Sequence, residues 1–199
     1  MLEEEISYAM RHAKYDPLLL EEVLSQDMVH VQSRTTLQSR QLFGLVSEVT
    51  GEFHKLKGFI RFELSPHKIL YAKVTVKNEI EDLLATFFKE RFPGFCIVIE
   101  SSRGCFIAHY NSPKVMFIKE DMSIVLKKLE SCLPRHDFLD DLEKSDQEIW
   151  KSFYDSQIIQ QRKNIASFSR CITKKYQHLK GLDHERYAQH SSKRLTDFT

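Results

Sequence analysis

The stretch FPGFCIVIESSRGCFIAHY, residues 92–110, decides the fold. A Pro-Gly pair precedes a first apolar run over residues 95–101, and a second run covers residues 105–110. Apolar and β-branched runs of this length favour strands, and the short polar interruption between them is typical of a hairpin turn. The stretch therefore predicts a β-hairpin. One of its faces is expected to hold Cys96, Val98, Glu100, Cys105, Ile107 and His109.

A helix is predicted directly before this hairpin. Apolar residues recur at helical spacing from Ile80 to Phe88, and the pattern stops at the Pro-Gly pair. Asn78 and Glu81 have the spacing of a capping box, in which the two side chains satisfy free N–H groups at the start of a helix. We therefore expect this helix to begin at Asn78.

Another hairpin is predicted before that helix. Residues 57–64 and 68–76 have strand composition, and Pro66 between them presets the first central dihedral angle of a tight turn. In the pairing that this turn suggests, Glu63 shares a face with Leu70. A further strand is expected at residues 115–119.

Helices are expected on both sides of the sheet segment. Asp16 and Pro17 have the pattern of a helix N-cap followed by proline, and apolar stripes recur over residues 6–13, 42–53 and 122–129. A capping pattern at Ser145 opens a long helical region after an acidic linker.

The predicted fold class is α+β, with an antiparallel sheet of four to five strands. Two hairpins separated by a helix form the sheet, and N-terminal and C-terminal helices pack on it. We expect a single domain over residues 1–182, followed by a polar, flexible tail over residues 183–199. The domain divides into N-terminal helices (1–53), the sheet with its inserted helix (57–119) and C-terminal helices (121–180).

Charge is unevenly distributed along a chain whose net charge is only +1. Residues 1–150 carry 19 Lys and Arg against 24 Asp and Glu, a net of −5, whereas residues 151–199 carry 10 against 4, a net of +6. A basic segment attracts phosphate and releases counterions on binding. The alternative is a solvated basic helix with no anionic partner.

Several classes of protein are disfavoured by the sequence. The four cysteines show no CxxC spacing, so we expect no metal site, no redox dithiol and no cofactor. The six glycines form no phosphate-binding loop. The N-terminus is acidic where a signal peptide would be basic, and no apolar run reaches the length of a membrane span. A cytoplasmic protein with free thiols and no membrane contact is expected.

Three short blocks place arginine among apolar residues: 58–62, 100–104 and 162–164. A guanidinium in an apolar run costs solvation free energy unless a carboxylate, a carbonyl or a ligand anion receives it. Arg61, Arg103 and Arg162 are therefore either structural pins, paired with buried acids such as Glu52, Glu63 or Glu100, or clamps that converge on a phosphate. Arg103 lies in a predicted turn and is the preferred ligand contact.

Acid–base or nucleophilic chemistry has fewer candidates. His54 with Glu52 and Glu63 has the groups for proton transfer, although a histidine at a helix end is more often a surface or capping residue. Cys96 opposite His109 suggests a cysteine nucleophile or, more simply, core packing.

The ordered set of motifs resembles a bacterial family of DNA-metabolism proteins, domain of unknown function 4130. The matching motifs are EFHKLKGFIRF (52–62), YA (71–72), FKERFP (88–93), ESSRG (100–104), IWK (149–151), IQQRKN (159–164) and KKY (174–176). The resemblance implies a domain of unassigned chemistry, encoded beside a radical S-adenosylmethionine protein that repairs or modifies DNA. In some chains it is fused to a uracil-DNA glycosylase. The family's recurrent polar residues fall on His54, Arg61, Arg91, Arg103, Arg162 and Asn164.

Three functions remain open at this point, and whether the chain is an enzyme is one of the open questions. The first is a DNA-repair accessory module that binds DNA or a radical S-adenosylmethionine repair protein through an arginine-rich face and a basic C-terminal helix. The second is a small enzyme acting on a nucleobase or nucleotide, with His54 or Glu100 as general base. The third is a purely structural interaction domain. The predicted nucleic-acid or anion-binding residues are Arg61, Arg91, Arg103, Arg162, Asn164, Lys174 and Lys175.

Overall fold

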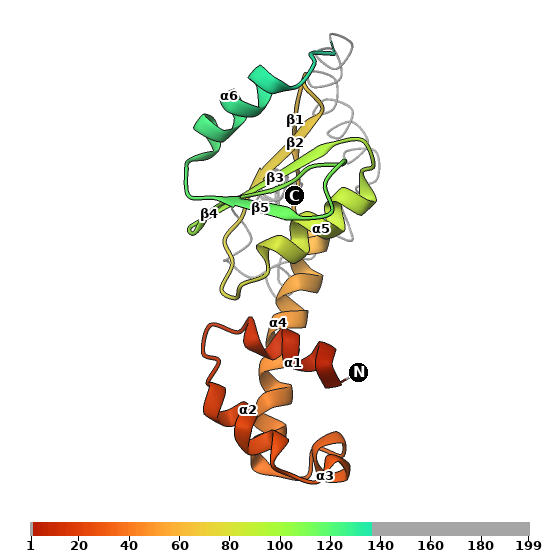
Figure 1. The fold of residues 1–199 in the computed structure, drawn as a ribbon, viewed down its shortest axis with the longest axis vertical. Coiled ribbons are helices and arrows are strands. Elements are labelled where there is room, and N and C mark those ends of the chain that lie inside the picture. Colours follow the sequence, from red (N-terminus) through yellow and green to blue (C-terminus); the bar gives the residue numbers. More distant parts are fainter. Residues whose placement is uncertain (1, 137–199) are drawn as a thin grey trace, which may run out of the picture.

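The computed structural model describes residues 2–136. Within them the N-terminal helices are α1 (Leu2–Met10), α2 (Pro17–Leu24), α3 (Met28–Gln32) and the long α4 (Leu37–Phe59). The sheet segment contains β1 (Glu63–Ser65), β2 (Ile69–Lys73), α5 (Glu81–Arg91), β3 (Cys96–Ser101), β4 (Gly104–Ala108), β5 (Val115–Ile118) and then α6 (Met122–Cys132). Figure 1 shows this arrangement. The predicted α+β class is confirmed. None of the described helices is long and apolar enough to cross a membrane.

The sheet has the strand order β1-β2-β3-β4-β5, and its pairs are antiparallel except β2 with β3. The expectation of a wholly antiparallel sheet was therefore wrong for that one pair. The reason is the connection: α5 carries the chain back along the sheet, so Ile69 at the start of β2 pairs with Cys96 at the start of β3. This is the parallel arrangement that a helical crossover produces.

The two faces of the sheet bury two apolar clusters, and every residue of β3 is buried. Ile97, Ile99 and Ala108 pack in the cluster that includes residues of α4 and α5, whereas Cys96, Val98, Cys105 and Ile107 pack in the cluster that includes Val125 of α6. Helices α5 and α6 lie on opposite sides of the sheet (Figure 1). The β3–β4 register confirms the predicted separation onto two faces for the paired residues, from Ile97 opposite Ala108 to Ser101 opposite Gly104.

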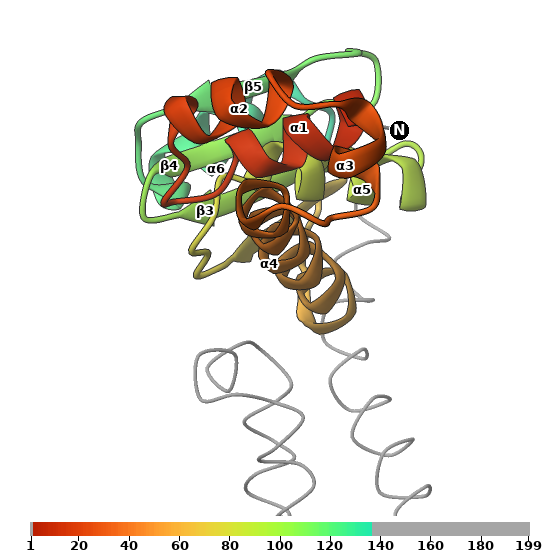
Figure 2. The ribbon, with the colours of Figure 1, turned by 90° about the horizontal axis from the view of Figure 1, so that it is seen from below.

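Helix α4 joins two parts of the molecule. Its C-terminal half contributes Val49 and Leu56 to the sheet-facing cluster. Its N-terminal half packs Leu42 and Phe43 against a separate cluster from α1, α2 and α3. Figure 1 shows these three short helices gathered along that half of α4, away from the sheet, and Figure 2 shows that they lie on one side of α4.

Local signals gave mixed outcomes at helix ends. Asp16 caps α2 by accepting the Leu18 N–H, with Pro17 in the first turn, as predicted. The capping box at Asn78 was wrong: Ile80 is the N-cap of α5 and makes no side-chain cap hydrogen bond. The side chains of Asn78 and Glu81 bind other partners instead, described below.

The first hairpin differs from its prediction in extent and register. Helix α4 continues through Phe59, so only Glu63–Ser65 form the first strand. The Lys68 N–H donates to the Ser65 carbonyl at 3.1 Å, which confirms the turn, but Ser65 pairs with Ile69 across a three-residue loop. Lys68 takes the left-handed conformation, with φ of 57°. Glu63 therefore pairs with Tyr71 and lies on the same face of the hairpin, whereas Leu70 lies on the other face. The reason is that one extra loop residue shifts the pairing by one position, which exchanges the two faces.

Candidate functional site

Arg103 lies in the two-residue turn between β3 and β4, and its guanidinium is held by Glu81 of α5. Nε donates to Glu81 Oε1 and Nη2 to Glu81 Oε2, both at 2.8 Å, and Nη2 also donates to the Asn78 carbonyl. Ser101 Oγ donates to Glu81 Oε1 at 2.6 Å. The Glu81 side chain is 1 % exposed, and its hydrogen bonds raise the pKa of Arg103 above the ordinary value. The structural-pin hypothesis anticipated such a pair, but with Glu52, Glu63 or Glu100 as the acid.

Glu52 belongs to the same polar network. Its carboxylate accepts the Lys77 N–H at 2.9 Å, the Asn78 N–H at 3.0 Å and the Asn78 amide group at 2.8 Å. Asn78 is buried and in turn accepts the Ala13 N–H at 3.2 Å. Glu52 therefore fastens the loop before α5 to α4, while Asn78 ties that loop to the chain after α1.

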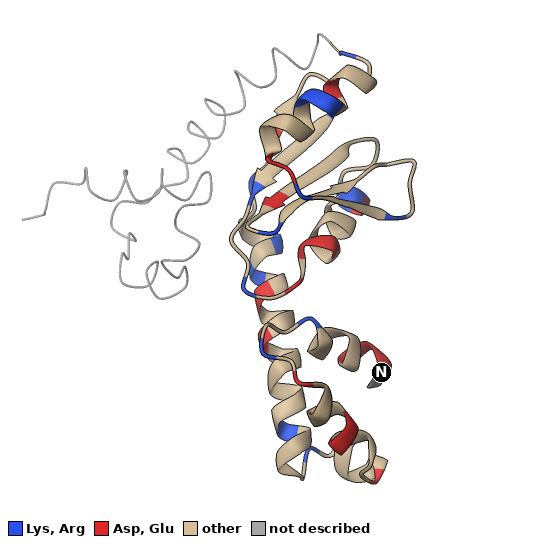
Figure 3. Cartoon of the chain, turned by 60° about the vertical axis from the view of Figure 1, so that its left-hand side comes forward, with Lys and Arg blue, Asp and Glu red and all other residues tan. Residues whose placement is uncertain are grey.

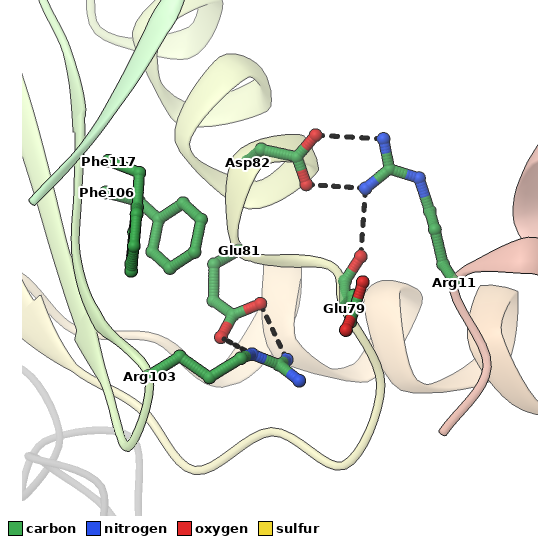
Figure 4. Close-up of a pocket in the computed structure, with 7 residues that line it drawn as sticks. All are labelled: Arg11, Glu79, Glu81, Asp82, Arg103, Phe106 and Phe117. Atoms are coloured by element: carbon green, nitrogen blue, oxygen red, sulfur yellow. Dashed lines mark hydrogen bonds and ion pairs between the residues drawn. The ribbon is translucent and has the colours of Figure 1, made fainter. Parts of the chain in front are cut away.

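A pocket of about 430 Å³ lies beside this network and is drawn in Figure 4. Arg11 Nη1 and Nη2 donate to the two carboxylate oxygens of Asp82 at 2.6 and 2.9 Å, and Nη1 also donates to the Glu79 carbonyl. Both arginines of the pocket thus face carboxylates, and the rings of Phe106 and Phe117 form its other wall (Figure 4). A phosphate would have to compete with Glu81 and Asp82 for these guanidinium groups.

Arg61 and Arg91 come together at a different place, which we call the aromatic groove. This groove has a volume of about 670 Å³ and lies between the end of α4, α5 and the β1–β2 hairpin. Three cationic residues line it, Lys57, Arg61 and Arg91, and both arginines are exposed. The remaining lining residues are apolar: Ile60, Phe62, Leu64, Leu70, Phe87, Phe88, Phe92 and Phe95.

The rings of the aromatic groove pack on one another and on a cation. Phe62 meets Phe88 edge-on with 4.7 Å between ring centroids, and Phe88 is stacked on Phe92 at 6.2 Å. Lys57 Nζ lies 4.5 Å from the ring centroid of Phe87, within cation–π range. Arg61 Nη1 donates to the carbonyls of Gly58 and Ile60 at the C-terminal end of α4, where the helix dipole favours positive charge.

Charge is distributed differently over the N-terminal helices. Figure 3 shows acidic residues on α1 and α2, and α1 carries Glu3, Glu4 and Glu5 in its first turn. Basic residues lie toward the C-terminal end of α4 (Figure 3), and this end of the helix borders the aromatic groove. An anionic ligand is therefore attracted to the groove and not to the α1–α3 end of the molecule.

The two candidate general bases are in unlike surroundings. His54 is exposed on α4 and makes no hydrogen bond or ion pair within residues 2–136. Glu100 is 8 % exposed; its Oε1 accepts the Met122 N–H at 2.9 Å, and its Oε2 lies 3.0 Å from Lys73 Nζ. Burial raises the pKa of Glu100, but the Met122 and Lys73 contacts outweigh burial and lower the pKa below its ordinary value. Glu100 thus anchors the start of α6 as a carboxylate.

This anchor predicts a pH-dependent contribution to stability. Since the folded-state pKa of Glu100 is lowered, its contribution is complete above the ordinary value of 4.5 and is lost as pH falls through the folded-state pKa. Glu100→Gln is expected to lower the free energy of unfolding by about 1–2 kcal/mol at pH 7. The difference from the unmodified protein should shrink below pH 4.5. Urea unfolding across this pH range measures it, and a difference that stays constant with pH would contradict the assignment.

Cys96 is the first residue of β3, His109 follows the last residue of β4, and the two share no hydrogen bond in the described part of the chain. Cys96 is fully buried in the cluster beneath α6, and burial raises the pKa of its thiol to about 11. His109 stacks on Tyr110 and accepts the Asn111 N–H. Residues 2–136 contain no group of three His, Cys, Asp or Glu side chains suited to a metal ion.

Several predicted site residues lie outside the described residues. They are Arg162, Asn164, Lys174 and Lys175, together with the predicted C-terminal helices beyond α6 and the tail over residues 183–199. The sequence analysis predicted Arg61 and Arg91 as anion-binding residues but missed the aromatic groove that both of them line. Its signal was present in FIRF (59–62) and FKERFPGF (88–95), where arginine and phenylalanine alternate closely.

A protein-family model matches residues 15–179, most of the chain. The chain belongs to the DUF4130 family. This family is described only as a domain of unknown function. Comparison with curated proteins and with solved structures gave no match. The DUF4130 match includes the aromatic groove and the Arg103–Glu81 network but begins after α1.

Proposed function

We propose that this DUF4130 chain is a nucleic-acid-binding accessory module in DNA repair or DNA metabolism, and that single-stranded DNA binds in the aromatic groove. The observation that carries the proposal is the combination of Lys57, Arg61 and Arg91 with phenylalanine rings in one groove. A radical S-adenosylmethionine protein that repairs or modifies DNA, the partner implied by the resemblance, belongs to the same proposal.

Single-stranded nucleic acid suits this lining for two physical reasons. Its bases are free to stack on aromatic side chains, at about 1–3 kcal/mol per base. Its phosphates are attracted to exposed guanidinium groups, and binding releases counterions. A base in a duplex is already stacked on its neighbours, so only the bases of an unpaired strand are free to stack on the rings of Phe62, Phe92 and Phe95.

A binding role is favoured over catalysis by the positions of the charged groups. An enzyme acting on a nucleotide requires an anion clamp and a perturbed acid or base that converge on one pocket. In the described residues Arg103 is held by Glu81 in one pocket, whereas Arg61 and Arg91 line another. Glu100 is engaged at the start of α6 and lines neither of them.

The test is fluorescence anisotropy of a labelled oligothymidylate strand with the full chain, over a series of salt concentrations. Arg61→Ala and Arg91→Ala are each expected to weaken binding about fivefold and to reduce the slope of log affinity against log salt by about 0.7. Phe92→Leu removes a ring but no charge, so it should weaken binding about fivefold with an unchanged slope. Circular dichroism checks that each variant is folded.

Lys127→Ala on α6 is the matched control, because it removes an exposed cation outside the groove lining. It should leave binding within about twofold of the unmodified protein. Equal losses for Lys127→Ala and Arg61→Ala would place the binding elsewhere. Tighter binding of duplex than of single-stranded DNA would overturn the stacking argument.

A further inference from the structure

The strand β5 forms one of the two edges of the sheet in the described part of the chain, and β1 forms the other. Strand β5 pairs with β4 through all four of its residues, Val115 to Ile118. In an antiparallel ladder every second residue directs its N–H and C=O groups away from the partner strand. No hydrogen bond from residues 2–136 satisfies the outward groups of β5. An edge of this kind is a template for another strand.

The side chains of β5 make this edge apolar at its centre and basic at its ends. Met116 is 47 % exposed and Phe117 is 53 % exposed, on opposite faces of the strand. The Phe117 ring lies 4.9 Å from that of Phe106 and forms part of the pocket wall in Figure 4. Lys114 and Lys119 flank the strand, and both are exposed.

The two lysines discriminate between partners. If a second copy paired antiparallel with all four residues of β5 aligned, Lys114 would lie opposite Lys119 at both ends. Like charges directly opposite each other destabilise a strand pair. A strand with acidic residues at both ends would instead place a carboxylate opposite each lysine. The edge thus disfavours self-association and favours an acidic partner.

We infer that the β5 edge is a docking site for an extended segment of a partner protein, in which about four apolar residues are flanked by acidic residues. Main-chain hydrogen bonds to β5 supply the affinity, as in other cases of strand addition. Apolar side chains on one face of the added strand contact Phe117, and those on the other contact Met116. The flanking carboxylates meet Lys114 and Lys119 and fix the register.

The inference is tested with the full chain and a labelled peptide, Glu-Val-Leu-Val-Leu-Glu, by fluorescence anisotropy. Lys-Val-Leu-Val-Leu-Lys is the charge-reversed probe and should bind at least about tenfold more weakly. In the double variant Lys114→Glu/Lys119→Glu the preference should reverse by a similar factor. Lys127→Glu, which makes one such charge change on α6, should leave the preference for the acidic peptide unchanged.

Strand pairing also has a backbone signature. A strand added at an edge uses the N–H groups of alternate residues. Methylating the nitrogens of one alternate set of peptide residues should therefore abolish binding, whereas methylating the other set should leave it within about threefold. Equal binding of the two methylated peptides, or of the acidic and basic peptides, would overturn the inference. So would a dimer of the unmodified chain in sedimentation that dissociates when Phe117→Asp is introduced.

Discussion

Replacing Glu81 with alanine is expected to lower the free energy of unfolding by about 3 kcal/mol, because it leaves the Arg103 guanidinium without its acid in a partly desolvated site. Glu81 accepts two hydrogen bonds from Arg103 and one from Ser101, and its side chain is 1 % exposed. The Arg103 side chain is 34 % exposed, so water recovers part of its solvation, which sets the loss at the lower end of the range for buried pairs. Urea unfolding at pH 7 measures the loss.

Two further variants distinguish the loss of the Glu81–Arg103 interaction from the general effect of removing a carboxylate in this region. Glu79→Ala removes an exposed carboxylate two residues away and is expected to change stability by less than about 0.5 kcal/mol. Glu81→Met with Arg103→Met replaces both charges by apolar side chains of similar length and should recover most of the stability lost in Glu81→Ala. The double variant could instead lose as much free energy of unfolding as Glu81→Met and Arg103→Met lose when their separate losses are added. In that case the interaction between the two residues is not what stabilises this turn.

The same residue shows how far the sequence alone could lead. Asn78 and Glu81 have capping-box spacing, but Glu81 also shares a helix face with Leu84, Ala85 and Phe88, all of which are buried. A carboxylate on an apolar stripe needs a buried cation or donor. That signal was available, although its partner Arg103 is 22 positions away and only the fold brings the two together.

Sheet pairing was predictable where the chain connects strands directly. The β3–β4 faces followed from alternation along residues 95–110, since a tight turn fixes both direction and register. The direction of the β2–β3 pair was predicted wrongly, although the helix that connects these strands was predicted and a helical crossover favours parallel pairing. The β1–β2 register failed for a smaller reason: the loop contains Lys68 in a left-handed conformation that sequence does not demand of lysine.

The candidate site was only half visible in the sequence. Arg61 and Arg91 were both predicted to bind anions, but the phenylalanines of the groove have the spacing of core residues, and one of them is a core residue. Phe88 is 5 % exposed in the sheet-facing cluster, whereas Phe62, Phe87, Phe92 and Phe95 are only partly buried around it. Helical or strand periodicity identifies an apolar face, but it does not show where that face emerges at the surface beside arginines from another element.

Gly104, the first residue of β4, is expected to tolerate no side chain. Its φ is +137°, a conformation that residues with a side chain rarely adopt. A Cβ atom at this position would lie 2.7 Å from the Ile118 carbonyl oxygen and 3.1 Å from Lys119 Cα. Both are backbone atoms of or next to β5, which is paired with β4, so neither can move without breaking the ladder. Gly104→Ala should therefore lower the free energy of unfolding by about 2–4 kcal/mol.

Gly51 provides the opposite case in the same chain. It lies inside α4, and a Cβ atom there would have nothing within 4 Å. Gly51→Ala is expected to raise the free energy of unfolding by about 0.5–1 kcal/mol, because alanine loses less backbone entropy in a helix. Urea unfolding of both variants beside the unmodified protein measures the contrast.

Since the Gly104 clash lies at the β5 pairing, the loss of stability in Gly104→Ala should be accompanied by faster amide exchange in β5. Slow exchange there, together with a loss below about 1 kcal/mol, would mean that the turn adapts to the methyl group.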